Sequence, residues 1–229
     1  MNSLHYKKHH RFLVAVDCII FGFDGAEIKA LLVKRSLEPE KDKWSLMGGF
    51  VTPDESVEQA ASRVLANLTG LTNIYMEQLH CFGDVNRDSA DRVISIAYFA
   101  LIKIADYSED LLNSHQAKWF SLNKIPALVF DHKEMIRLSQ ERLQQKVSSH
   151  PIGFELLPHS FTLQQLQALY EAVYNTTFDK RNFTKKILSL NLLKKLNEKE
   201  KTTSRKGAFL FVFDKKKYEK LNKEGLKFL

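Results

Sequence analysis

The chain has 229 residues, of which 44% are hydrophobic and 27% are charged, and its formal net charge is +7. This length and apolar content supply a core for one large domain or two small ones. No apolar run is long enough to span a membrane, and residues 1–11 lack a signal-peptide core, so we expect a cytoplasmic protein. The cysteines, Cys18 and Cys81, lack CxxC spacing, which favours reduced core residues over a disulfide or a zinc site.

Positive charge is concentrated in the C-terminal third. Residues 151–229 contain 16 Lys and Arg against 8 Asp and Glu, whereas residues 1–150 contain 18 and 19. The polar stretch before Pro151, followed by Gly153, interrupts the preceding helical pattern. The sequence therefore predicts two domains, residues 1–150 and 151–229.

The first predicted element is a β-hairpin. Two runs rich in strand-forming residues, 12–21 and 28–33, flank Asp24-Gly25, a strong hairpin signal. Residues 44–51 then predict a strand and a glycine turn, and Pro53 suits the start of a helix, where its missing N–H costs nothing.

Residues 49–71 resemble a Nudix box, the loop and helix of diphosphohydrolases. They keep the spacing of its fixed positions but lack its metal-binding glutamates. Three positions where that family carries metal-binding glutamates hold Val64, Asn67 and Leu68. The residues in register with the box are Gly49, Glu55, Arg63, Leu65, Gly70 and Leu71.

The three substituted positions share one helical face because they are spaced i, i+3 and i+4. Magnesium needs carboxylate and phosphate oxygens there, and without it nothing activates a water or neutralises the leaving diphosphate. We therefore expect a binding pocket with no catalytic residue, no metal and no cofactor. Glu55 and Arg63, eight residues apart, are expected to form a structural ion pair.

Residues 161–190 predict two helices joined by a short turn, with Thr162 and Asp179 as their N-caps. Apolar residues recur at helical spacing on the first helix, and on the second we expect Phe183, Ile187, Leu188 and Leu190 to face inward. The pair resembles a helix-turn-helix whose second helix lies in the major groove. Its candidate DNA contacts are Arg181, Asn182, Thr184 and Lys185.

Two strands, residues 192–196 and 208–213, are predicted after these helices, with a basic loop over 197–207. A hairpin with a basic tip after a helix-turn-helix is the layout of a winged helix, and its candidate DNA contacts are Lys201, Arg205 and Lys206. A basic stretch is often only solvated surface. Here the positive charge and the predicted topology together favour a surface that binds double-stranded DNA over one that is merely solvated.

Nearly the whole chain resembles the Nudix-related transcriptional regulators, which include NrtR-type and AraR-type proteins. The most specific segments are residues 31–35, 44–51, 82–88, 92–98, 119–120, 130–132 and 161–182. The resemblance implies an α+β fold: a Nudix α/β/α sandwich with a mixed sheet, then a winged helix-turn-helix that binds an operator as a homodimer. It departs from the group at Leu46-Met47, where Leu-Pro is usual.

The expected function is a ligand-responsive DNA-binding regulator, a repressor by resemblance. Its effector is a small sugar or sugar nucleotide; the missing acids favour an L-arabinose-like pentose over ADP-ribose. Polar groups at strand ends near the glycine loop, with flat apolar walls that include Trp119, make the candidate pocket. Its candidate residues are Arg35, Gly49, Phe82, Arg87, Asp88, Arg92, Tyr98, Asp131 and His132.

Simpler roles remain open: Arg87 and Asp88 as a surface pair, and His132 as a helix cap. Two other classes of function also remain. One is an active hydrolase of ADP-ribose-type substrates that recruits Glu58 or another acid for its metal and carries a nucleic-acid-binding domain. The other is an adaptor whose basic domain binds an acidic protein.

Overall fold

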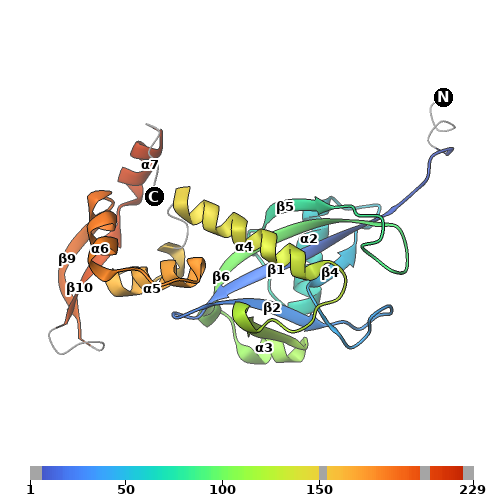
Figure 1. The fold of residues 1–229 in the computed structure, drawn as a ribbon, viewed down its shortest axis with the longest axis horizontal. Helices are drawn as coiled ribbons and strands as arrows, with labels where there is room; N and C mark the ends of the chain where they lie inside the picture. Colours follow the sequence, from blue (N-terminus) through green and yellow to red (C-terminus); the bar gives the residue numbers. More distant parts are fainter. Residues whose placement is uncertain (1–6, 150–153, 202–206, 224–229) are drawn as a thin grey trace. The chain divides into compact units, whose positions relative to one another are not determined.

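The computed structural model describes residues 7–149, 154–201 and 207–223, and its contacts divide the chain into two compact units (Figure 1). The first contains the described residues up to Phe21, Ala30–Ala100 and Asp106–Ser139. The second contains Gly22–Lys29, Leu101–Ala105 and the described residues from Gln140 onward. The predicted boundary between residues 150 and 151 lies outside the described residues and stays a prediction.

A mixed seven-stranded sheet forms the first unit, in the order β3-β2-β1-β6-β5, with β4 paired to β1 and β7 paired to β2. Antiparallel pairs join β1 to β4, β2 to β3 and β5 to β6. The strands are β1 (Leu13–Phe23), β2 (Ile28–Lys34), β3 (Trp44–Ser45), β4 (Met47–Phe50), β5 (Glu77–Phe82), β6 (Val93–Lys103) and β7 (Ala117–Ser121).

The predicted hairpin is confirmed between β1 and β2. Gly25 adopts a φ of 100°, which favours glycine, and Asp24 Oδ1 accepts hydrogen bonds from the N–H groups of Ala26 and Glu27. Cys18 in β1 is buried, but Cys81 is exposed, so its expected core position is wrong. The reason is that β5 forms an edge of the sheet.

Helices cover both faces of this sheet. On one face lies α2 (Val57–Thr69), and on the other α4 (His132–Ser149) begins (Figure 1). Adjacent residues of β1 show this, because neighbouring side chains of a strand point to opposite faces. Cys18 Sγ contacts the Ala61 carbonyl in α2, whereas Asp17 faces His132. The remaining regular elements here are α3 (Glu109–Ser114) and the short 3-10 helices η1 (Ile104–Asp106) and η2 (Leu122–Lys124).

The α2 helix has strong signals at both ends. Ser56 and Gln59 form a reciprocal capping box, and Gly70 ends the helix in the left-handed region with a φ of 74°. Pro53 lies in the turn before the helix, so the helix begins later than the proline suggested.

The second unit contains a three-stranded sheet in the order β8-β10-β9 and the winged helix arrangement. Thr162 and Asp179 cap the two helices as predicted. Its elements are η3 (Phe154–Leu156), β8 (Phe161–Thr162), α5 (Leu163–Tyr174), α6 (Lys180–Ser189), β9 (Leu193–Glu200), β10 (Ala208–Phe213) and α7 (Lys215–Lys223).

Two details of this unit differ from the sequence prediction. Leu188 is 43% exposed, so its inward position is wrong, while Ile187 is buried. The first wing strand continues to Glu200, four residues beyond its predicted end. No helix among the described residues is long and apolar enough to cross a membrane.

Candidate functional site

The Nudix-like loop is held by the predicted ion pair. Arg63 Nε donates to Glu55 Oε2 at 2.8 Å, and Arg63 Nη2 donates to the Phe50 carbonyl at 2.9 Å. Glu55 Oε1 also accepts from the Thr52 N–H at 2.8 Å. The hydrogen bonds from Arg63 lower the pKa of Glu55 to about 2. This pair therefore holds the turn between β4 and α2.

The substituted acidic positions take three different environments on α2. Val64 is buried, Asn67 is exposed and Leu68 is half-buried. A Cβ built on Gly49 would lie 2.7 Å from Val64 Cγ2, so the valine packs directly against the glycine turn. Among the described residues, no group of three His, Cys, Asp or Glu side chains is arranged to hold a metal ion.

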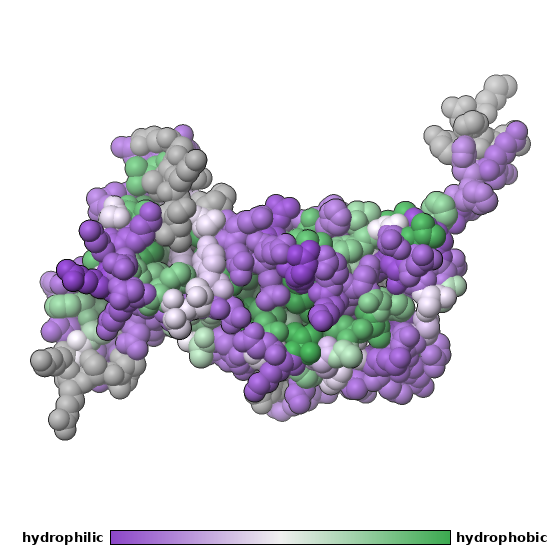
Figure 2. All heavy atoms as spheres, in the orientation of Figure 1, coloured by the Kyte–Doolittle hydropathy of each residue, from purple (hydrophilic) through white to green (hydrophobic). Residues whose placement is uncertain are grey.

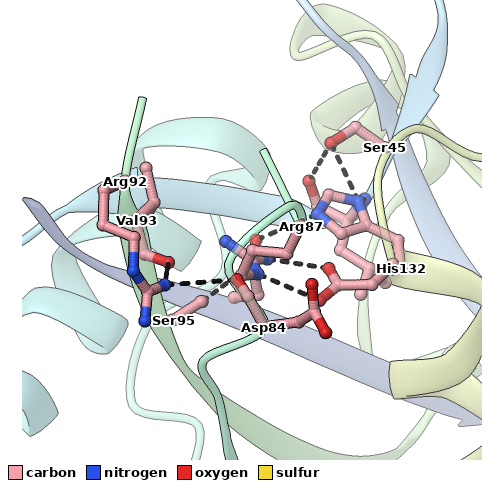
Figure 3. Close-up of polar contacts among 10 residues, drawn as sticks. Ser45, Asp84, Arg87, Arg92, Val93, Ser95 and His132 are labelled. Atoms are coloured by element: carbon pink, nitrogen blue, oxygen red, sulfur yellow. Dashed lines mark hydrogen bonds and ion pairs between the residues drawn. The ribbon is translucent and has the colours of Figure 1, made fainter. Parts of the chain in front are cut away.

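On the α4 face of the sheet, buried polar side chains form one network (Figure 3). Arg87, in the loop between β5 and β6, donates from Nε to Asp131 Oδ2 at 2.9 Å and from Nη2 to Asp131 Oδ1 at 2.8 Å. Arg87 Nη2 also lies 3.4 Å from Asp17 Oδ2, which accepts from Ser95 Oγ at 2.6 Å. The simpler role of this arginine, a surface pair with Asp88, is wrong, because its side chain is only 3% exposed and its ion-pair partners are Asp131 and Asp17.

His132 joins this network through both ring nitrogens. The Leu46 N–H donates to Nδ1 at 3.1 Å, and Nε2 lies 3.4 Å from Asp17 Oδ1. Because Nδ1 accepts from the Leu46 N–H, Nε2 is the ring nitrogen that faces Asp17. The histidine thus connects the start of α4 to the strand that precedes the glycine turn.

Asp17 is the anionic centre of the network and is only 4% exposed. Burial by itself would raise its pKa, but His132, the Ser95 hydroxyl and the Arg87 charge together hold the pKa below its ordinary value. Ionised Asp17 balances the charge of Arg87 in the interior. A bound group that competes for Arg87 would therefore change the electrostatics of the whole cluster.

The loop between β5 and β6 is also held by Arg92. Its Nη1 donates to the Asp84 carbonyl at 3.2 Å (Figure 3). Its Nη2 donates to the Gly83 carbonyl at 3.0 Å, and its guanidinium lies over the Phe12 ring. Asp88 accepts from the Ala90 N–H at 2.8 Å within the same loop. These two candidates therefore shape the loop that carries Arg87.

A neighbouring hollow of about 610 Å³ lies in the first unit, and Arg35 contacts its wall at Phe130 but is not among its lining residues. Arg35 Nε donates to the Pro39 carbonyl at 2.6 Å, and its guanidinium lies 5.1 Å from the centre of the Phe130 ring. Phe130 and Trp44 line the hollow, and Lys34 Nζ lies 4.5 Å above the Trp44 ring. Because Phe130 directly precedes Asp131, the hollow is adjacent along the chain to the buried network.

The remaining pocket candidates lie apart from this network. Tyr98 is three residues from Ser95 on β6, so it faces α2, where its hydroxyl is buried near Glu58. Gly49 also faces α2, through Val64. Phe82 makes an edge contact with His80 on the edge strand. The predicted single pocket thus divides between the two faces of the sheet.

Sequence reasoning missed Asp17, Ser45 and Ser95. Ser45 Oγ lies 3.4 Å from His132 Nδ1, so all three belong to the network. One signal was present: Asp17 is a lone carboxylate in the middle of an otherwise apolar strand, where an unpaired charge is unfavourable.

The candidate DNA contacts of α6 form an outward face of the second unit. Arg181, Asn182 and Lys185 are exposed and Thr184 is half-buried. Hydrophilic residues cover this region in the view of Figure 2. Lys201 is exposed at the end of the described wing strand, whereas Arg205 and Lys206 lie outside the described residues.

The wing carries two further cations that the sequence analysis did not select. Lys195 Nζ lies 3.5 Å and Lys199 Nζ 4.5 Å from the centre of the Phe209 ring, and all three side chains are exposed. An exposed aromatic ring next to two ammonium groups presents positive charge on the same domain as α6.

Known protein families match both units of the chain. The NUDIX domain family matches residues 11–139, and the family described as the NrtR DNA-binding winged helix domain matches residues 153–213. The ADPR responsive transcriptional repressor NtrR of Acinetobacter baylyi is 29% identical over 90% of this chain and 84% of its own length. An ADP-ribose pyrophosphatase of Methanocaldococcus jannaschii is 37% identical over 57% of this chain and 76% of its own length.

Two solved structures of Shewanella oneidensis NrtR are also similar. The complex with a 27mer DNA is 30% identical, with a TM-score of 0.73 over 87% of this chain and 93% of that chain. The NUDIX domain complexed with ADP ribose is 33% identical, with a TM-score of 0.51 over 62% of this chain and 99% of that chain.

Proposed function

Because the chain belongs to the NrtR-type family, in which a NUDIX domain precedes a winged helix domain, we propose that it is a transcriptional repressor that binds duplex DNA and responds to ADP-ribose. The observation that carries this proposal is its similarity over both domains to a regulator complexed with DNA. Two of the relatives are described with ADP-ribose as a ligand or effector, and none of those compared names a pentose. These relatives therefore favour ADP-ribose over the L-arabinose-like effector expected from the missing acids.

The α4 face of the sheet is the proposed effector site. Arg87 supplies a positive charge for a diphosphate, and the hollow lined by Trp44 and Phe130 supplies aromatic walls for a base or sugar. Its volume of about 610 Å³ is in the range of small-molecule pockets. Arg35, Arg92, Asp131 and the other sequence candidates on this face stay proposed contacts.

Direct titration tests the effector. We expect isothermal titration calorimetry to give saturable binding of ADP-ribose and none of L-arabinose. Asp131→Asn should weaken ADP-ribose binding by about tenfold, because Arg87 loses the partner that orients it. The exposed Asp54→Asn is the matched control and should bind normally. Saturable binding of L-arabinose without binding of ADP-ribose would identify the effector as a pentose instead.

The outward face of α6 and the wing are the proposed DNA-binding surface. Arginine and asparagine can read base edges, and lysines contact phosphates, so binding should weaken steeply as salt is raised. Two copies in a homodimer would contact half-sites one helical turn apart. ADP-ribose would act by favouring one arrangement of the dimer, and a coupling of about 1–3 kcal/mol is typical of such regulators.

Selection from a random duplex library, followed by fluorescence anisotropy, tests this surface. Arg181→Ala and Lys185→Ala should weaken binding of the selected duplex, whereas Lys133→Ala, an exposed helical lysine of the first unit, should not. Light scattering of the complex reports whether two chains bind. If duplex DNA fails to bind even at low salt, an adaptor for an acidic protein becomes the better assignment.

A hydrolase is the second candidate function. Glu58 offers an exposed carboxylate in the first turn of α2, and hydrogen bonds from its own N–H and from Ser56 lower its pKa, so it is ionised at neutral pH. The similar Methanocaldococcus protein is an ADP-ribose pyrophosphatase. We expect no turnover of ADP-ribose with Mg²⁺, measured by chromatography of AMP; turnover that Glu58→Gln abolishes would establish the hydrolase instead.

A further inference from the structure

The helix α7 carries a concentration of positive charge, since its nine residues include five lysines and one glutamate. At about 100° of rotation per residue, Lys216, Lys220 and Lys223 fall within about 60° of the helix surface, and all three are exposed. None of the three has an ion-pair partner among the residues that the structure describes. Because like charges spaced i and i+4 repel each other, an anion bound along this lysine stripe would stabilise the helix.

The opposite face of α7 packs on its own domain. The ring centres of Tyr218 and Phe213 lie 5.8 Å apart, and Phe213 stacks on Phe154 with ring centres 4.3 Å apart. Leu221, on the same side of the helix as Tyr218, is half-buried. A helix that binds a membrane surface needs a free apolar face to insert between the lipid headgroups. Since α7 uses its apolar residues within the domain, its lysine stripe fits a hydrophilic polyanion better than a lipid surface.

The start of α7 is fixed beside the end of α6. The Asp214 N–H donates to the Leu192 carbonyl at 2.8 Å, and Leu192 lies three residues after the last residue of α6. The Asp214 carboxylate also accepts from the Lys217 N–H at 3.1 Å and pairs with Lys194 of β9 at 2.8 Å. Figure 1 shows α7 beyond one end of α6, and both belong to the second compact unit. The stripe is therefore carried by the same unit as the exposed cations of α6 and the wing.

Duplex DNA is the polyanion that fits this arrangement. It carries about one negative charge per 1.7 Å of its axis, and the stripe from Lys216 to Lys223 extends for about 10 Å, so one duplex can face several cations of this unit together. Lysine binds a phosphate as a point charge, without the fixed geometry that a base edge demands. The stripe therefore suits the DNA backbone.

We propose that Lys216, Lys220 and Lys223 bind DNA phosphates beyond the base pairs that α6 contacts. The inference rests on the proposed function in assigning α6 to the major groove. The match to the winged helix family ends at residue 213, so the contacts of α7 are additional to those of that module. Phosphates carry no base sequence, and α7 therefore strengthens binding to any duplex by the same factor.

Salt dependence of DNA binding measures these contacts. Each phosphate neutralised by a lysine adds about 0.9 to the slope of log affinity against log salt concentration, so three lysines contribute about 2.7 for each chain bound. Between about 50 and 200 mM salt, the unmodified chain should lose ~40-fold more affinity per chain than the triple variant Lys216→Gln, Lys220→Gln, Lys223→Gln. Fluorescence anisotropy with the full chain measures both slopes. Glutamine and lysine have similar helix propensities, so the variant keeps α7 helical.

A second triple variant controls for net charge. Lys41→Gln, Lys124→Gln and Lys133→Gln together remove the same charge from exposed lysines of the first unit and should leave the slope unchanged. An equal fall in slope for both triple variants would overturn the proposal, because net charge alone would then explain the effect. An unchanged slope in the α7 variant would overturn it too.

Two duplexes of equal length separate the role of α7 from that of α6. The α7 variant should weaken binding of the selected duplex and of its scrambled sequence by the same factor, and a loss confined to the selected duplex would contradict phosphate binding. Arg181→Ala should weaken mainly the selected duplex. If it does not, while the scrambled duplex still depends on α7, the proposed role of α6 fails and that of α7 stands. Cosedimentation with phosphatidylserine vesicles that the α7 variant abolishes would assign the stripe to a lipid surface instead.

Discussion

Gly49→Ala tests whether Val64 fills the space beneath the Nudix-like turn. The new methyl carbon would lie 2.7 Å from Val64 Cγ2, whereas carbon atoms in contact are about 3.5–4.0 Å apart. The valine must therefore move by about 1 Å. It is 3% exposed and β-branched, so it has little rotamer freedom to do so. Such overpacking costs about 1–3 kcal/mol of unfolding free energy.

A double-mutant cycle identifies the cause. Val64→Ala alone should cost about 1–3 kcal/mol, because it removes two buried methyl groups. The three atoms nearest to a Cβ at Gly49 all belong to Val64, so the double variant should be more stable than the sum of the single costs predicts, by about 1 kcal/mol or more. Both tryptophans, Trp44 and Trp119, lie in the first unit, so their fluorescence in urea reports on this unit. Single costs that add within about 0.5 kcal/mol would refute the packing argument.

Three further predictions concern stability. The pKa of Glu55 is about 2, below its ordinary 4.5, so its contribution is complete above pH 4.5 and is lost as pH falls toward 2; Glu55→Gln should flatten that acid loss in pH-dependent urea unfolding. Arg87→Met should cost about 3 kcal/mol in the same assay, because it leaves Asp17 charged and buried, and a loss below about 1 kcal/mol would contradict the network. Ser56→Ala and Thr162→Ala each remove an N-cap and should cost about 1 kcal/mol, the first in tryptophan fluorescence of the first unit and the second in amide hydrogen exchange of α5.

Local signals in the sequence were sufficient for the elements that depend on local contacts. Thr162 and Asp179 cap α5 and α6 because each side chain accepts from an N–H three residues later. The Asp24-Gly25 hairpin needs only its own turn geometry. The Glu55–Arg63 pair follows from a spacing that brings both side chains to one end of α2. In each case the partners lie within about one to three helical turns in the chain.

The candidate site depends on the order of the strands in the sheet, and no local pattern in the sequence indicates that order. Asp17, Ser95 and His132 meet because β1 lies beside β6 and α4 begins over both, and these residues are far apart in the chain. Without that order, candidates from both faces of the sheet were assigned to one pocket. Leu188 was placed inward for a different reason, its apolar side chain: at 100° per residue it lies about 100° around α6 from the buried Ile187, and it is exposed.

Recognition and turnover are physically separable in this fold. The turn between β4 and α2 is held by Glu55, Arg63 and the packing of Val64 against Gly49, and none of these contacts requires a metal ion. The buried network of Asp17 lies on the opposite face of the sheet, so replacing metal-binding acids on α2 leaves its hydrogen bonds intact. A ligand that the protein does not consume can hold one conformational state for as long as it stays bound. Under the proposed function, binding ADP-ribose on the network side of the sheet without hydrolysing it would therefore suit a sensor.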